Sequence, residues 1–139
     1  MKLNFIYSIE YEKERVNYYI KNKKKYRNYN ILMPENDIIF NINEYKKREK
    51  EIKKDFNYKI KKIKLSFLLK EYNIILTKYG TGGSYRLPNT IILNLVYKNT
   101  FKIILHEMLH LWLEKRIGTL DSSEKELIID SLCTYILKK

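Results

Sequence analysis

The chain has 139 residues and carries 28 lysines and arginines against 16 aspartates and glutamates, which gives a formal net charge of +12 at pH 7. Hydrophobic residues make up 45% of the sequence and aromatic residues 14%, enough to bury a core, so a wholly disordered chain is excluded. No apolar run approaches the roughly 20 residues of a membrane-spanning helix, and the single cysteine, Cys133, excludes an intrachain disulfide and a cysteine-based zinc cage.

The first half of the chain predicts a scaffold. Residues 1–11 alternate loosely enough to form a short strand, and residues 12–26 predict a helix. Residues 31–42 predict a loop followed by a short strand. Within residues 43–72, apolar side chains recur every three or four positions, which predicts one long amphipathic helix that covers a sheet. The side chains of that apolar face are Ile52, Phe56, Ile60, Ile63 and Phe67.

Two strands are predicted next. Residues 73–79 and 90–97 are rich in isoleucine and leucine, and a glycine-rich segment, residues 80–84, lies between them. We interpret the segment as a flexible turn, because it lacks the lysine and the helix start of a phosphate-binding loop. The two strands therefore predict part of an antiparallel sheet.

Two helices complete the chain. Residues 100–117 predict a helix that ends at Gly118, a favourable residue beyond a helix C-terminus. Residues 121–138 predict a second helix, and Asp121 is a good N-cap for it. We expect a single α+β domain over residues 1–139, with a small, mostly antiparallel sheet, a long amphipathic helix and two C-terminal helices.

The motif whose residues could carry out a reaction lies on the first of these two helices. The only histidines of the chain, His106 and His110, flank Glu107 in an H-E-x-x-H pattern. Their spacing places both imidazoles on one helix face, where each can offer a nitrogen to one Zn²⁺ ion. Glu107 can take the proton of a zinc-bound water that attacks a carbonyl carbon. The alternative is two core histidines bonded to backbone carbonyls, with Glu107 at an exposed edge.

A third ligand must come from elsewhere, because a catalytic zinc usually has three protein ligands and one open position. With no further histidine and a lone cysteine, it must be a carboxylate. The last helix offers Asp121, Glu124, Glu126 and Asp130. At about 100° per residue, Glu126 and Asp130 share a face that Glu124 does not. We therefore predict Glu126 as the ligand and Asp130 as the acceptor of a histidine N–H. The alternatives are a Ser123–Glu126 capping box and a hydrogen bond from Asp130 to a loop.

His106-Glu107-x-x-His110 followed by Glu126-x-x-x-Asp130 resembles the gluzincin metallopeptidases. In that group two histidines and a downstream glutamate hold zinc, and an aspartate one turn later supports a histidine. The short chain is also similar to the minigluzincins and to the ImmA/IrrE-like and SprT-like metallopeptidases, although SprT-like proteins generally use a third histidine that is missing here. The resemblance implies a zincin-like metallopeptidase that binds one Zn²⁺ per chain, with Glu107 as the general base.

The resemblance covers residues 73–137 and implies that they form the catalytic core. It also implies that the strand at residues 90–97 lies beside the metal, with an edge that pairs with an extended peptide or protein substrate. Residues 1–30 would form an N-terminal extension outside that core. No histidine remains to stabilise the oxyanion, so a tyrosine or an arginine would have to do so.

Two other functions remain open from the sequence. The charge of +12, and tyrosines interleaved with lysines in residues 18–30 and 45–72, fit a basic non-enzymatic module that binds nucleic acid or another protein. The excess of lysine also reflects an A/T-rich codon bias, because the chain is rich in Lys, Asn, Ile and Tyr and contains no Ala. The other alternative is a latent zinc-binding zymogen whose residues 1–30 block the cleft. Without a signal-peptide pattern or a membrane span, we expect a cytoplasmic protein.

Overall fold

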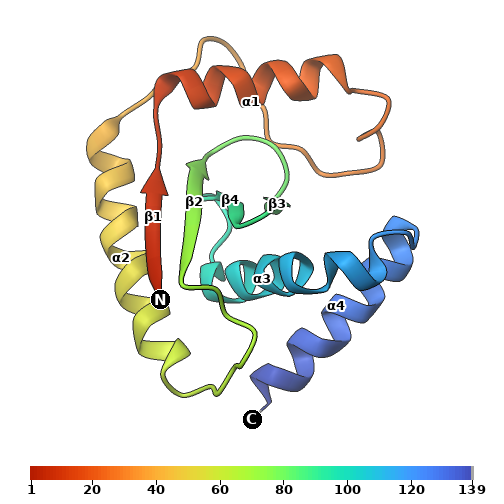
Figure 1. Cartoon of the computed structure of the whole chain (residues 1–139). Coiled ribbons are helices and arrows are strands. Elements are labelled where there is room, and N and C mark those ends of the chain that lie inside the picture. The colour runs from red at the N-terminus through yellow and green to blue at the C-terminus, as the bar shows by residue number, and fades with distance from the viewer. Residues whose placement is uncertain (139) are drawn as a thin grey trace.

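The computed structural model describes residues 1–138, and within them four helices accompany a four-stranded mixed sheet (Figure 1). The elements follow one another as β1 (Lys2–Ile6), α1 (Ile9–Lys21), α2 (Ile42–Ile60), β2 (Glu71–Thr77), β3 (Gly83–Arg86), β4 (Thr90–Asn94), α3 (Thr100–Ile117) and α4 (Ser122–Leu137). The predicted α+β class is confirmed. None of the helices in this part of the chain combines the length and apolar character of a bilayer-spanning segment.

The sheet has the strand order β1-β2-β4-β3. β2 pairs in parallel with both β1 and β4, and only β3 and β4 are antiparallel. The expectation of a mostly antiparallel sheet is therefore wrong. The segment between β2 and β4 is short enough to suggest a hairpin, but it contains β3. The chain therefore reverses direction once before β3 and once after it, so β4 runs in the same direction as β2.

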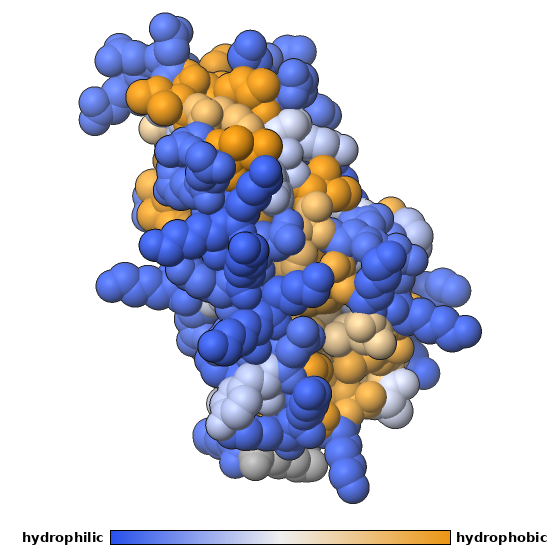
Figure 2. Space-filling view, turned by 90° about the vertical axis from the view of Figure 1, so that its left-hand side faces the viewer, coloured by the Kyte–Doolittle hydropathy of each residue, from blue (hydrophilic) through white to orange (hydrophobic). Residues whose placement is uncertain are grey.

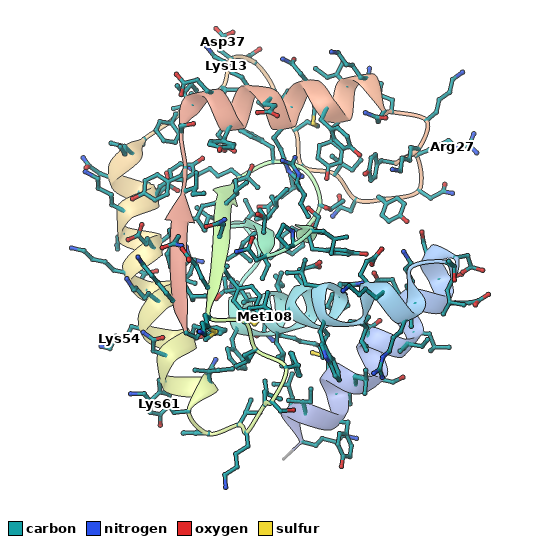
Figure 3. The ribbon with its side chains drawn as sticks, viewed as in Figure 1. Lys13, Arg27, Asp37, Lys54, Lys61 and Met108 are labelled. Atoms are coloured by element: carbon teal, nitrogen blue, oxygen red, sulfur yellow. The ribbon has the colours of Figure 1, made fainter. Side chains whose placement is uncertain are left out.

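The core lies where α3 and α2 meet the sheet. The inward side chains of β2 and β4 are completely buried, namely Ile74, Leu76, Ile91 and Leu93, and they share one apolar cluster with α2 and α3. Phe56 of α2 and Phe101 of α3 touch with ring centroids 5.5 Å apart. Met108 of α3 is buried in this interior, whereas Lys54 and Lys61 project outward (Figure 3). The surface on the α2 side of the molecule is accordingly dominated by hydrophilic residues (Figure 2).

The long amphipathic helix is shorter than predicted. α2 ends at Ile60, and the apolar period continues through Ile63 and Phe67 in the connection to β2. Phe67 stacks on Trp112 of α3, with ring centroids 4.6 Å apart. The chain must turn back here to enter β2, so packing overrides the helical pattern of the sequence.

Elsewhere in the first half of the chain, the elements of the structure differ little from the predicted ones. The predicted strand of residues 1–11 is confined to β1, because Ser8 starts α1 by accepting a hydrogen bond from the N–H of Tyr11 at 3.1 Å. α1 ends at Lys21, and the expected strand within residues 31–42 does not form. β1 pairs with β2, and α1 lies across the end of the sheet at which these strands finish (Figure 1). Residues 1–30 therefore pack against the rest of the domain.

Candidate metal centre

The H-E-x-x-H motif lies on α3, a helix that is buried on nearly all sides because apolar residues occupy most of its positions. Glu107 is only 5% exposed and His110 only 3%, while His106 is partly buried at the surface of the cleft. The alternative in which Glu107 sits at an exposed edge is therefore wrong. Buried polar groups need partners, and for the two histidines these partners come from α4.

Glu126 of α4 bridges the two histidines. Its Oε2 atom lies 2.9 Å from His106 Nε2, and its Oε1 atom lies 2.9 Å from His110 Nε2. One ligand atom from each of these three residues falls within 4.8 Å of the others. The three predicted ligands are thus close enough to bind one metal ion. Two imidazole nitrogens and a carboxylate oxygen are donors that Zn²⁺, among several transition metals, accepts.

Asp130 lies behind the first histidine, one helical turn beyond Glu126. Its Oδ1 atom is 3.2 Å from His106 Nδ1, on the side of the ring opposite Nε2. His106 therefore lies between two carboxylates, one at each ring nitrogen. The equivalent Nδ1 atom of His110 is buried and has no hydrogen-bond partner among the described residues. Only one of the two imidazoles is oriented by a carboxylate at its outer nitrogen.

The charges of the site act on one another. Hydrogen bonds from His106, the larger effect, and from His110 lower the pKa of Glu126 to about 2. Burial alone would lower the pKa of His106, but the hydrogen bond to Glu126 and the neighbouring carboxylates outweigh burial and raise that pKa. Burial raises the pKa of Glu107 to about 7, against the opposing charges of the two histidines. Glu107 can therefore gain or lose a proton close to neutral pH.

The start of α4 excludes a capping role for Glu126. Asp121 is the N-cap, as predicted, and accepts a hydrogen bond from the N–H of Glu124 at 2.9 Å. Ser123 lies inside the helix, where its hydroxyl donates to Asp121 Oδ1 at 2.8 Å. The Ser123–Glu126 capping box is therefore wrong. The helix start is thus capped by Asp121 through the N–H of Glu124. The Glu126 side chain is not needed there and faces the histidines.

Strand β3 approaches the motif closely. A Cβ atom on Gly83 would lie 2.6 Å from Ile103 Cγ2 and 3.2 Å from Glu107 Oε1. Real Cβ atoms are essentially never found at the first of these distances. The absence of a side chain at Gly83 therefore lets β3 lie directly beside the carboxylate of Glu107.

Tyr85, two residues further along β3, was not singled out from the sequence. Its ring stacks on the imidazole of His110 with centroids 4.7 Å apart and an interplanar angle of 14°. Its hydroxyl donates to Glu114 Oε2 at 2.7 Å. Burial and this hydrogen bond raise the pKa of Tyr85. Nothing distinguishes it among the 13 tyrosines of the sequence, because the contact depends on how β3 lies on α3.

A cleft of about 750 Å³ opens over the site. α3 and the start of α4 form one wall, β3 borders it, and α1 with residues 25–29 forms the opposite wall. The strand expected to present a free edge, residues 90–97, contains β4, which is paired on both sides. That expectation is wrong, since β3 is the edge strand on this side of the sheet.

No protein family, curated protein or solved structure matches this chain significantly. The candidate site is therefore defined by its own geometry.

Proposed function

We propose that the protein is a zinc-dependent metallopeptidase that hydrolyses peptide bonds. The observation that supports this best is the convergence of His106, His110 and Glu126 on one point, beside the buried carboxylate of Glu107. Three protein donors leave a position open for water, as in catalytic rather than structural zinc sites. A cleft of about 750 Å³ is within the range of substrate pockets.

A zinc ion in this site would act as a Lewis acid toward a carbonyl oxygen and would acidify water. Glu107, buried beside the metal donors, would take a proton from the attacking water and deliver it to the departing amine. With zinc bound, Asp130 would accept the Nδ1–H of His106 and so leave the Nε2 lone pair, which faces Glu126, available to the metal. Tyr85 holds the His110 ring by stacking on it.

The substrate would lie against β3. Among the described residues this edge strand pairs with another strand on one side only, and it borders the cleft beside Glu107. An extended peptide can add to such an edge by main-chain hydrogen bonding. Its scissile carbonyl would then lie near both the metal donors and the general base.

The decisive experiment combines metal analysis with a catalytic knockout. Protein purified without chelators and supplied with Zn²⁺ should hold one equivalent per chain, and His106→Ala or His110→Ala should lose it. Glu107→Gln should keep the metal and lose cleavage of a quenched-fluorescence peptide library. Absence of stoichiometric metal binding, or a Glu107→Gln protein as active as the native one, would contradict the proposal.

A further inference from the structure

The charged residues that line the cleft divide into two groups. The acids, Glu107 and Glu126, both belong to the metal centre. Every other charged side chain of the lining, histidines aside, is a cation: Arg15, Lys25, Arg86 and Lys102. Within residues 1–138, none of these four cations has a carboxylate oxygen within 4.0 Å. The cleft therefore combines an acidic metal-binding end with unneutralised positive charge.

Arg15 of α1 is the most unusual member of this group. It is only 9% exposed, and its buried Nη2 atom has no hydrogen-bond partner among the described residues. Its Nε donates a long hydrogen bond to the Tyr79 carbonyl at 3.4 Å. Arginine is almost never buried without a partner, because desolvating the charge is costly. Burial accordingly lowers the pKa of Arg15.

Glu12 attracts Arg15 electrostatically but forms no direct ion pair with it. Glu12 lies one turn earlier on α1, but its Oε2 atom accepts hydrogen bonds from the Tyr45 hydroxyl at 2.5 Å and from the Lys78 N–H at 3.0 Å. No ion pair within 4.0 Å joins Glu12 to Arg15. Among the described residues the guanidinium therefore has no carboxylate in direct contact, although the charge of Glu12 opposes the lowering of its pKa by burial.

The guanidinium is held in place by its neighbours. It lies over the ring of Tyr19, 4.9 Å from the ring centroid. The Tyr19 hydroxyl accepts a hydrogen bond from the N–H of Thr81 at 3.3 Å. Gly80 has a φ of +87°, and a Cβ there would lie 2.3 Å from the Tyr19 ring and 3.0 Å from Arg15 Nε. The loop that leads into β3 is therefore packed tightly against both side chains.

Arg86 supplies a second guanidinium at the end of edge strand β3. It is exposed, lines the same cleft, and its positive charge adds to the lowering of the pKa of Arg15. Two guanidinium groups that repel each other across a cleft favour an anion between them. The planar donor fork of arginine fits a carboxylate through two parallel hydrogen bonds.

We propose that Arg15 and Arg86 form a carboxylate-binding subsite, so that the peptide which enters the cleft carries an acidic side chain or a free C-terminal carboxylate near its scissile bond. This inference rests on the proposed peptidase function for the identity of the ligand as a peptide. Lys25 and Lys102 add positive potential along the same cleft and attract acidic peptides over basic ones.

The test is a binding measurement that does not depend on cleavage. Glu107→Gln protein is titrated, with and without Zn²⁺, into fluorescent peptides that differ only by glutamate or glutamine at one position. A second pair differs by a free or an amidated C-terminus. Fluorescence anisotropy should show roughly tenfold tighter binding of one acidic peptide than of its amide, as expected for charge-assisted hydrogen bonds. The first pair reports a side-chain carboxylate and the second a terminal one.

Matched arginine variants locate the effect. Arg86→Met and Arg15→Met should each remove most of the acid-over-amide preference. Arg48→Met removes the same charge from α2, where Arg48 pairs with Glu51 and does not line the cleft, and should leave the preference intact. Because Arg15 is buried, Arg86→Met keeps the test valid if Arg15→Met fails to fold.

The outcomes separate this inference from the proposed function. Equal binding of acid and amide peptides, no measurable binding of either, or a preference that survives both arginine variants overturns the subsite. If an oligonucleotide displaces the bound peptide while acidic peptides do not, and if Arg15→Met and Arg86→Met weaken oligonucleotide binding, the carboxylate subsite is rejected in favour of a nucleic-acid site. Acid-selective binding without any cleavage by the native enzyme leaves the subsite standing and rejects the peptidase. Cleavage without acid preference does the reverse.

Discussion

Asp130 Oδ1 lies 3.2 Å from His106 Nδ1, one turn of α4 beyond the carboxylate that meets the other nitrogen of the same ring. Glu126 and Asp130 thus act on opposite sides of one imidazole. Such an arrangement fixes which nitrogen carries the proton and leaves the other free for a metal. The relationship makes Asp130 a positioning residue for the proposed site.

Removal of the Asp130 carboxylate should weaken metal binding without abolishing it. We expect Asp130→Ala to lower the affinity for Zn²⁺ by roughly 10- to 100-fold, because His106 loses the acceptor that orients it. Competition with a chromophoric chelator measures the change. Glu124→Ala is the matched control, since this exposed acid of α4 lies at the helix start beside Asp121. Equal affinities for the two variants would contradict the positioning role.

The stability of the metal-free protein should depend on pH in a defined way. The folded-state pKa of Glu126 is about 2, below its ordinary 4.5, so its stabilising contribution is complete above pH 4.5 and is lost as the pH falls toward 2. The pKa of Glu107 is raised to about 7, so stability declines as the pH rises from 4.5 to 7. The raised pKa of His106 extends this decline above pH 6.5.

Urea unfolding of chelator-treated protein should therefore show maximal stability near pH 4.5. Glu107→Gln removes the group responsible for the decline between pH 4.5 and 7, so that part of the profile should become flatter. A native profile that rises steadily from pH 4.5 to 7 would show that Glu107 is not held in its buried, pKa-raised state.

Gly83 offers a test of how closely β3 must approach the site. In Gly83→Ala the new methyl group would collide with Ile103 and press on Glu107, so β3 must move away from α3. Such overpacking lowers the free energy of unfolding by about 1–3 kcal/mol. The rate of peptide cleavage should fall even under conditions in which the variant is fully folded. Gly82→Ala is the control, because its methyl group would meet only the Tyr97 ring at an ordinary 3.6 Å. Similar activity in both variants would contradict the close approach.

The grouping of the metal donors could be predicted because it depends on helical periodicity. His106 and His110 share a face of α3, and Glu126 lies on the face of α4 that meets them. The direction of the strands could not be predicted, because a ten-residue gap that reads as one hairpin contains β3. The contributions of Tyr85 and Arg15 depend on packing between elements distant in sequence. No local sequence pattern distinguishes Tyr85 from the other tyrosines or Arg15 from the other arginines.

Tyr85 allows the stacking on His110 to be separated from the hydrogen bond to Glu114. Tyr85→Phe keeps the stacked ring and loses only the hydroxyl, while Glu114 retains Lys125 at 3.6 Å, so we expect a loss of about 1 kcal/mol in stability and near-native zinc affinity. Tyr85→Leu removes the planar ring that confines His110, whose Nδ1 has no partner to hold it, and should weaken zinc binding several-fold. Urea unfolding and chelator competition measure the two effects. If Phe and Leu variants bind zinc equally well, stacking does not position His110.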